Sequence, residues 1–428
     1  MKNRKLFMLL LPVAAVCGLL LLNALKNDLP VKHKTDATNA GLTLPKGFNA
    51  VVLADNLGIT RHIAVTSKGY IYVKLNKLKD GKGILELHDN GDKADIVSSF
   101  GDFPGTGMYV KGTSLYASSN EEVFRYKLDA KDQVTNPEHP DKLVTGLISR
   151  NGEHEAKAIL VDISDNLYVN IGAFSNSCQE KDRQRGSMGI KGCPVLDSAA
   201  GIWQFKATKL NQHYSDGVRY ATGLRNVVGM DWNYVNNQLF VMQHGRDQLH
   251  DIFPALYDVK QSSLLPAECM YALQKGDNAG WPYIYYDEIQ HKKILAPEYG
   301  GDGKKEGGKD AIDPAVAFPG HLAPVGLLFY TGNQFPERYK NGAFIAFHGS
   351  WNRAPEPQAG YFVVFQPFKD GKPDGPWEVF ADGFSGSKAQ TESGRAEHRP
   401  CGLAQSVDGS LYITDDVKGT LYKITYKK

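Results

Sequence analysis

The chain of 428 residues lacks several features that would place it in a common class. Its net charge is only +2, which gives no general case for nucleic-acid binding. It has five cysteines, none in a CxxC or CxxCH pattern, so the sequence predicts neither a thiolate zinc site nor an attached c-type haem. No stretch beyond the N-terminus has helical periodicity, which argues against a mainly helical fold.

What the sequence has instead is a short pattern that recurs six times. In each copy a polar turn precedes an alternating apolar strand, and a second strand usually follows. The copies begin at Ser67, Gly112, Ser164, Asn236, Asn341 and Asp408. Apolar strands precede them at 62–65, 107–110, 158–161, 227–232, 325–330 and 402–406. Each unit therefore has three clear strands and a less clear fourth, a pattern typical of radial or stacked β architectures.

The sequence therefore predicts an all-β, six-bladed β-propeller over residues 46–428, with two separate β-sandwiches as the alternative. The strand-like segment 47–55 is expected to close the final blade, because an open ring leaves two unpaired sheet edges. Residues 250–320 are interpreted as a long insertion between blades four and five. In a propeller the inner strands line one central channel, so residues far apart in sequence meet at its mouth.

The N-terminus has the pattern of a targeting segment. Positively charged residues at the start precede an uncharged apolar run over residues 6–22. No clear cleavage site follows, which favours an uncleaved membrane anchor over a cleaved signal peptide within residues 1–26. Residues 27–45 are then a polar linker. Both interpretations predict export to the periplasm or cell envelope, and the first predicts association with the membrane.

Export permits disulfide bonds. Outside the apolar N-terminal run, Cys178 and Cys193 flank one polar loop and are the predicted pair. A disulfide that closes a loop of this size contributes roughly 3 kcal/mol in the chain-entropy model. A second pair between Cys269 and Cys401 stays open at this point.

Cationic side chains and histidines recur at the blade entrances, either before a predicted inner strand or after the next strand outward. They are His154, Lys157, Arg225–Asn226, His321, Arg399, the HGRD motif (244–247) and the HGSWNR motif (348–353). Converging arginines repel one another unless an anion lies among them, and guanidinium groups suit planar carboxylates. These residues indicate a flat polycarboxylate ligand. The alternative is local pairing of each arginine with an acidic residue, as for Arg246 with Asp247.

Five motifs together resemble a known family. They are GLRNVVGMDW (223–232), FVMQHGRDQL (240–249), GWPY (280–283), FIAFHGSWNR (344–353) and RPCGLAQSVDGSLYITDD (399–416). In this order they resemble the soluble glucose/sorbosone dehydrogenases, six-bladed propellers that use pyrroloquinoline quinone (PQQ), with the sorbosone dehydrogenase-like branch as the closer match. The resemblance covers most of residues 47–426. It implies periplasmic oxidation of a sugar or polyol hydroxyl, with PQQ and Ca²⁺ as cofactors and an external quinone or cytochrome as electron acceptor.

The resemblance also implies roles for individual residues. His154 matches the general base, and a neutral imidazole suits that proton abstraction. PQQ bears three carboxylates. The residues that the resemblance assigns to PQQ binding are Arg225, Asn226, Arg246, Arg353, Arg399 and Lys157. The backbone carbonyls of Gly245 and Arg246 would hold Ca²⁺. The chain departs from the family at Ala173, where the acidic residue that orients the base is missing, and this departure predicts lower activity or a changed substrate.

Two other functions stay open. One is a calcium-dependent lactonase or esterase, which would need a central metal held by several carboxylate and amide side chains. The other is a non-catalytic propeller that binds partners or glycans. The aromatic residues of 280–287 either stack on a sugar or cofactor or form a packed plug.

Overall fold

The computed structural model describes residues 38–150 and 152–427, and most of their elements are β-strands. Six sheets form six blades, and each blade has four antiparallel strands ordered from inner to outer. Blade one consists of β2 (Thr60–Val65), β3 (Tyr70–Lys79), β4 (Lys82–Asp89) and β5 (Ala94–Phe100), and blade two of β6 (Met108–Lys111), β7 (Ser114–Ser118), β8 (Val123–Lys127) and β9 (Asp141–Thr145). Blade three consists of β10 (Ile159–Val161), β11 (Asn166–Ile171), β12 (Gly201–Lys206) and β14 (Val218–Thr222), and blade four of β15 (Val227–Asn233), β16 (Gln238–Gln243), β17 (Glu268–Leu273) and β21 (Val316–Phe318). Blade five consists of β22 (Pro324–Phe329), β23 (Ala343–Phe347), β24 (Phe362–Gln366) and β27 (Glu378–Ala381), and blade six of β28 (Pro400–Gln405), β29 (Leu411–Asp415), β30 (Leu421–Tyr426) and β1 (Phe48–Ala54).

Two blades carry a short extra strand on their outer edge. β13 (Gln212–His213) pairs in parallel with β9 of blade two, and β18 (Asp277–Asn278) pairs in parallel with β14 of blade three. Each comes from the chain of the following blade, so these strands tie neighbouring blades together at the rim.

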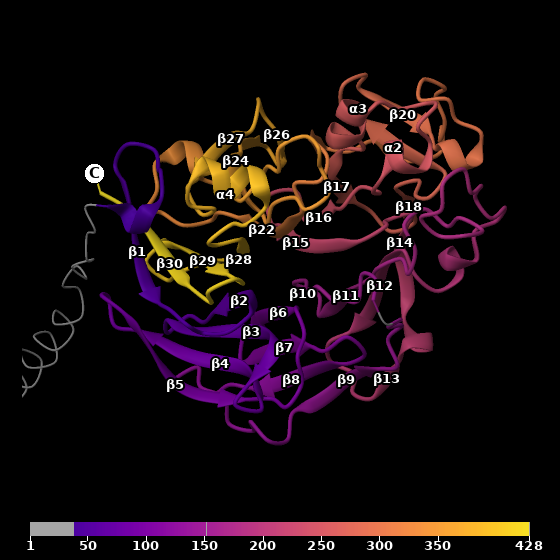
Figure 1. Cartoon of the computed structure of the whole chain (residues 1–428). Helices are drawn as coiled ribbons and strands as arrows, with labels where there is room; N and C mark the ends of the chain where they lie inside the picture. The colour runs from indigo at the N-terminus through magenta and orange to yellow at the C-terminus, as the bar shows by residue number, and fades with distance from the viewer. Residues whose placement is uncertain (1–37, 151, 428) are drawn as a thin grey trace, which may run out of the picture. The chain divides into compact units, whose positions relative to one another are not determined.

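The inner strands form a closed ring. Each contacts the inner strand of the next blade, in the order β2, β6, β10, β15, β22, β28 and back to β2 (Figure 1). The hydrophobic cores lie between neighbouring blades, where the apolar residues of the alternating strands pack face to face. The predicted six-bladed propeller is therefore confirmed, and the alternative of two β-sandwiches is wrong.

The N-terminal strand of the domain closes the ring. β1 pairs antiparallel with β30, so that Phe48 lies opposite Tyr426. Figure 1 shows the two strands side by side, indigo against yellow. This closure removes the two sheet edges that an open ring would expose. The predicted role of residues 47–55 is confirmed.

The packed domain begins before residue 46. Leu42 is buried against the core of blades five and six, and the backbone N–H of Thr43 donates to the carbonyl of Asp382 at 2.8 Å. The predicted linker therefore contributes its last residues to the fold. Residues 1–37, which include the predicted targeting segment, lie outside the described residues. Within the described part of the chain, no helix is both long and apolar enough to span a membrane.

The stretch 250–320 differs from the interpretation as an insertion between blades. It contains β17 and β21, the third and fourth strands of blade four. The added segment lies between these two strands and includes the hairpin of β19 (Ile284–Asp287) and β20 (Lys292–Leu295). Two short helices, α2 (Leu249–Ile252) and α3 (Val259–Leu264), precede β17. The strand signals of β17 were hidden because this strand follows a long connection rather than a tight turn.

The structure confirms the predicted disulfide and decides the pair that the sequence left open. Cys178 and Cys193 form a disulfide bond with a Cα–Cα distance of 6.0 Å. Both residues are buried in the core of blade three. Cys269 and Cys401 are free and buried, so the second pair that the sequence left open does not form.

Candidate functional site

A pocket of about 220 Å³ lies at the N-terminal ends of the inner strands of blades three to five. These ends are blade entrances, where the sequence places its cations and histidines. The lining residues are Gly152, Glu153, His154, Arg183, Arg225, His244, Gly245, Asp247, Glu268, His321, Ala323, Trp351 and Asn352. The fold thus brings together residues from positions 152 to 352 at one site.

His154 lies in the loop before β10 and is partly buried. Its Nδ1 atom is 2.5 Å from the carbonyl oxygen of Ala173, which can only accept a hydrogen bond, so Nδ1 carries the proton. The lone pair of the neutral ring is then on Nε2. Burial, together with the positive charge of Arg225, lowers the pKa of His154 to about 3. The imidazole is therefore neutral near pH 7 and able to accept a proton at Nε2.

The backbone around His154 leaves no room for a larger residue at position 172. A Cβ atom on Gly172 would lie 2.6 Å from the Cβ of His154 and 3.0 Å from Oδ1 of Asn226. His154 itself has a positive φ of 51°, a conformation that costs energy for a residue with a side chain. Tight packing thus fixes the position of the imidazole.

Arg225 precedes β15, and only 3% of its surface is exposed. Its Nη2 atom donates to Oδ2 of Asp247 at 2.8 Å, and Nη1 donates to the carbonyl of Gly245 at 2.8 Å. Burial alone would raise the pKa of Asp247, but Arg225, His321 and Arg183 together hold it well below its usual range. The pair is therefore ionised, with a guanidinium group at the pocket wall.

Two further histidines, His244 and His321, line the pocket. Nε2 of His244 is 2.9 Å from the carbonyl of Pro324, and burial lowers the pKa of His244 to about 4. Nε2 of His321 is 2.8 Å from the carbonyl of Ser262, and its Nδ1 is 3.2 Å from the amide nitrogen of Asn352. In the neutral ring of His244, Nε2 donates to the carbonyl of Pro324 and Nδ1 keeps its lone pair.

The structure places the predicted site residues in two groups. His154, Arg225 and Gly245 line the pocket. Asn226 adjoins it, since its Nδ2 atom is 3.5 Å from Nδ1 of His244 and its Oδ1 is buried without a hydrogen-bond partner among the described residues.

The other predicted cations do not line the pocket, although Nε of Arg246 donates to the carbonyl of the pocket residue Asp247. Arg246 forms a buried ion pair with Glu298 at 2.7 Å, and not with Asp247. Arg353 donates to the carbonyls of Ser263, Gly320 and Pro357. Arg399 donates to the carbonyl of Gly394 and lies over the ring of Tyr361. Lys157 is buried and donates to the carbonyl of Glu155, and burial lowers its pKa to about 8.

Several pocket residues escaped the sequence reasoning. Arg183 lies within the disulfide loop, where it contacts Glu153 at 3.0 Å and Asp247 at 3.2 Å. Glu268 begins β17, and burial raises its pKa to about 7. Asn352 donates to Oδ1 of Asp247 at 2.7 Å. Asp247 and Asn352 belong to the HGRD and HGSWNR motifs, so these motifs carried a signal for them, whereas the loop around Arg183 carried none.

The aromatic segment 280–287 forms a packed plug. The indole of Trp281 is buried in the core of blade three, and its Nε1 donates to the carbonyl of Asn176 at 3.0 Å. The burial of Trp281 supports the plug, whereas stacking of the partly buried Tyr283 and Tyr286 on a ligand stays a prediction. The exposed aromatic residue at the pocket is Trp351, with 65% of its surface accessible.

Arg225 and Arg183 pair with Asp247 and Glu153, as the alternative of local pairing proposed, so a planar quinone that carries carboxylates fits this donor set only through the guanidinium N–H groups left free. Two guanidinium groups, those of Arg183 and Arg225, line the pocket together with the exposed indole of Trp351. Arginine suits carboxylates, and an indole offers a flat face. The predicted calcium ligands fit less well, because the Gly245 carbonyl already accepts a hydrogen bond from the cationic Arg225. Residues 38–150 and 152–427 hold no cluster of three or more His, Cys, Asp or Glu side chains suited to a metal.

The sequence matches the TrAA12-like family over residues 42–286 and 294–427. Among curated proteins, it is 23% identical over 426 residues to a pyrroloquinoline quinone-dependent pyranose dehydrogenase of Coprinopsis cinerea. That alignment covers 90% of this chain and 54% of the pyranose dehydrogenase, so the chain spans about half the length of this relative.

Solved structures share the fold. The calcium structure of the Trichoderma reesei protein of carbohydrate-active enzyme family AA12 has a TM-score of 0.72 and 20% identity, covering 94% of this chain and 100% of that one. The holo form of the pyranose dehydrogenase PQQ domain from Coprinopsis cinerea has a TM-score of 0.69 and 22% identity, covering 90% and 97% of the two chains. The sorbosone dehydrogenase-like branch, which the motifs indicated, stays a prediction.

Proposed function

This chain belongs to the TrAA12-like family, and we propose that it is a PQQ-dependent dehydrogenase that oxidises a sugar hydroxyl at the pocket around His154. The observation that carries the proposal is the neutral imidazole of His154, with its proton on Nδ1, in the same pocket as the guanidinium of Arg225. A base and a carboxylate-binding cation side by side suit a dehydrogenase with an anionic cofactor. The name of the Coprinopsis cinerea relative supports both the cofactor and the substrate class.

Each pocket residue would have a separate role in the proposed reaction. Bound PQQ would supply a quinone that accepts a hydride from the substrate carbon. Arg225 and Arg183 would bind its carboxylates, and Trp351 would cover one face of the ligand. Nε2 of His154 would accept the proton of the substrate hydroxyl, because Nδ1 is engaged by Ala173.

Finer features of the proposal rest on the sequence. An aldose, pyranose or sorbosone-type sugar or a polyol is the proposed substrate, and a quinone or cytochrome the external electron acceptor. The N-terminal segment supports a location in the periplasm or cell envelope. Ca²⁺ stays a predicted second cofactor, and no step of the proposed reaction depends on it.

The test is the addition of PQQ to the purified apoprotein, with CaCl₂ or with EGTA. We expect a bound-quinone absorption band at a one-to-one ratio and dye-linked oxidation of aldoses. A requirement for CaCl₂ would support the predicted metal. If the protein takes up no PQQ under either condition, the proposal fails, and the binding-module alternative then ranks above the enzyme.

The calcium-dependent lactonase ranks lower. Such an enzyme needs a metal held by several carboxylate and amide side chains, whereas the carboxylate of Asp247 is taken by Arg225 and Arg183. Hydrolysis of a chromogenic lactone or ester, measured in the same preparations, separates the two enzymes.

A further inference from the structure

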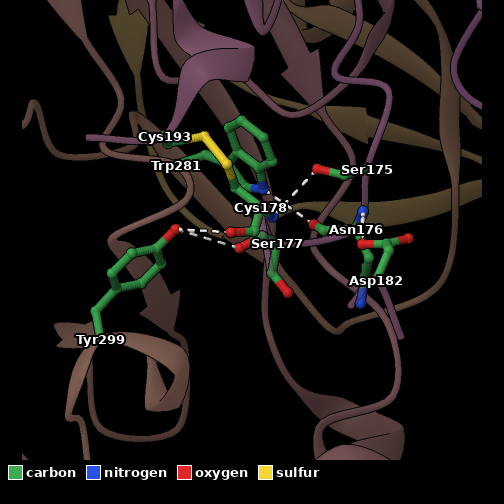
Figure 2. The surroundings of a disulfide bond; sticks show 8 residues. All are labelled: Ser175, Asn176, Ser177, Cys178, Asp182, Cys193, Trp281 and Tyr299. Carbon is green, nitrogen blue, oxygen red and sulfur yellow. Dashed lines mark hydrogen bonds between the residues drawn. A yellow bond between two sulfur atoms is a disulfide. The ribbon is translucent and has the colours of Figure 1, made fainter. Parts of the chain in front are cut away.

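Asn176 lies in the loop after β11 and is fully buried. Figure 2 shows it two residues before Cys178, beside the disulfide bond. We propose that Asn176 is a positioning residue that holds Arg225 and Asp247 in the geometry needed for cofactor binding, and that the Cys178–Cys193 disulfide anchors it. The inference rests on the proposed function for the identity of the cofactor.

The side-chain amide of Asn176 joins both members of the ion pair. Its Oδ1 accepts hydrogen bonds from Nη2 of Arg225 at 3.0 Å and from the backbone N–H of Asp247 at 2.8 Å. Its Nδ2 donates to the carbonyl of Asp247 at 3.0 Å. These three contacts use both ends of the amide, so a residue of blade three fixes two residues of blade four.

The backbone carbonyl of Asn176 adds a second hold on Arg225. It accepts from Nε of Arg225 at 3.0 Å. With Gly245 and Asp247, the contacts of Asn176 occupy four of the five guanidinium N–H groups. One Nη1 N–H has no partner in the described part of the chain, and it lies on a residue that lines the pocket. The guanidinium is thus fixed in plane with one donor left for a ligand carboxylate.

The disulfide fixes the loop that carries Asn176. The N–H of Asn176 donates to Asp182 at 3.0 Å, and that of Cys178 to Oγ of Ser175 at 3.1 Å (Figure 2). The hydroxyl of Tyr299 donates to the carbonyl of Cys178 at 3.3 Å. Within the loop that the disulfide closes, Nη2 of Arg183 lies 3.2 Å from Oδ2 of Asp247. Asp247 is therefore contacted from both sides of Cys178, by Asn176 before it and by Arg183 within the loop that the disulfide closes.

The experiment compares Asn176→Ala with Asn233→Ala. Asn233 is another buried asparagine, at the far end of the strand that follows Arg225, where its Oδ1 accepts from Val235. The dissociation constant of PQQ is measured by titration of the quinone absorption, and the free energy of unfolding is measured on the apoproteins. We expect N176A to weaken PQQ binding by about tenfold or more, the effect of one hydrogen bond to a charged group. N233A should bind PQQ like the wild type.

A second measurement does not need the cofactor. In a double-mutant cycle with Arg225→Met, the losses of unfolding free energy from N176A and R225M should not add, because both variants remove the same contacts. If N176A does not fold, Asn176→Leu takes its place, since it keeps the approximate size of the side chain and removes every hydrogen bond of the amide. The variant C178A/C193A should weaken PQQ binding in the same direction.

The outcomes separate this inference from the proposed function. PQQ uptake by the wild type with unchanged affinity in N176A, or additive losses in the cycle, would overturn the role of Asn176 and leave the dehydrogenase intact. Failure of the wild type to take up PQQ would overturn the proposed function, and with it the role of Asn176 in cofactor binding. Weaker PQQ binding in N176A, together with non-additive losses of unfolding free energy in the double-mutant cycle, supports both the role of Asn176 and the proposed function.

Discussion

His154 donates a hydrogen bond from Nδ1 to the backbone carbonyl of Ala173. The family resemblance implies an acidic side chain at this place, and its absence predicted lower activity or a changed substrate. A carbonyl oxygen accepts a hydrogen bond as a carboxylate does, but it carries no full charge. It therefore fixes the tautomer without raising the pKa as strongly, in agreement with the low pKa of His154. The predicted loss of activity need not follow from the missing acid.

The first prediction concerns the base. His154→Ala should lower the turnover of sugar oxidation by roughly 100- to 10,000-fold, the usual effect of losing a general base. PQQ binding should persist, because the cations of the pocket remain. His139→Ala, at an exposed histidine, is the control and should keep wild-type turnover. Dye-linked oxidation at the wild-type rate in H154A would refute the assignment.

The second prediction ranks the arginines. Arg225→Lys should weaken PQQ binding by about 10- to 100-fold, because lysine keeps the charge but loses the planar fork. Arg353→Ala and Arg399→Ala should have smaller effects, because neither side chain lines the pocket and both guanidinium groups donate to carbonyls outside it. Titration of each apoprotein with PQQ gives the comparison. An equal loss in all three variants would mean that the two outer arginines contact the cofactor after all.

The third prediction concerns pH. Burial raises the pKa of Glu268 from 4.5 to about 7, so between these values the folded chain binds more protons than the unfolded chain. This group therefore contributes less to the free energy of unfolding as pH rises through that window. Glu268→Gln removes the effect.

The measured quantity for Glu268 is the difference in free energy of unfolding between E268Q and the wild type. It should rise by roughly 1–3 kcal/mol, in favour of the variant, between pH 4.5 and 8. Glu337→Gln, at an exposed position, should give a constant difference. A flat difference for E268Q would show that the carboxyl titrates as in the unfolded chain.

The fourth prediction concerns ring closure. Deletion of residues 47–55 removes β1 and exposes the edge of β30, as well as the apolar core that Phe48 covers. We expect aggregation or loss of the cooperative unfolding transition. Size-exclusion chromatography and thermal unfolding measure both. Val52→Ser, at an exposed position of β1, is the control and should leave a folded monomer.

The fold was predictable because each blade contains one copy of the sequence repeat. The inner and second strands are buried on both sides or alternate cleanly, so segments such as 227–232 stand out in the sequence. The fourth strands do not stand out. β14 has the burial pattern of an edge strand with exposed residues, and β21 is three residues long, so neither has a strong apolar signal. For this reason the sequence predicted blade four incompletely.

The site was predictable where a motif includes the residue that lines the pocket. Arg225 was found in this way, and His154 was found by its position before a predicted inner strand. The sequence could not show which arginines have structural partners, because Arg246 pairs with Glu298 and Arg353 with carbonyls that are distant along the chain. Nor did the sequence indicate that Arg183 belongs to the site. Its loop has the composition of a polar surface segment, and only the structure reveals its ion pair with Asp247.

The pairing of β1 with β30 also sets the order of events during synthesis. β1 leaves the ribosome before its partner β30, which follows the strands of the other five blades along the chain. At about 5–20 residues per second, β1 waits for tens of seconds without its neighbour. Until then five blades can form while the ring stays open. The ring therefore closes only after β30 has left the ribosome, which leaves a period in which the open chain can still be recognised as unfolded.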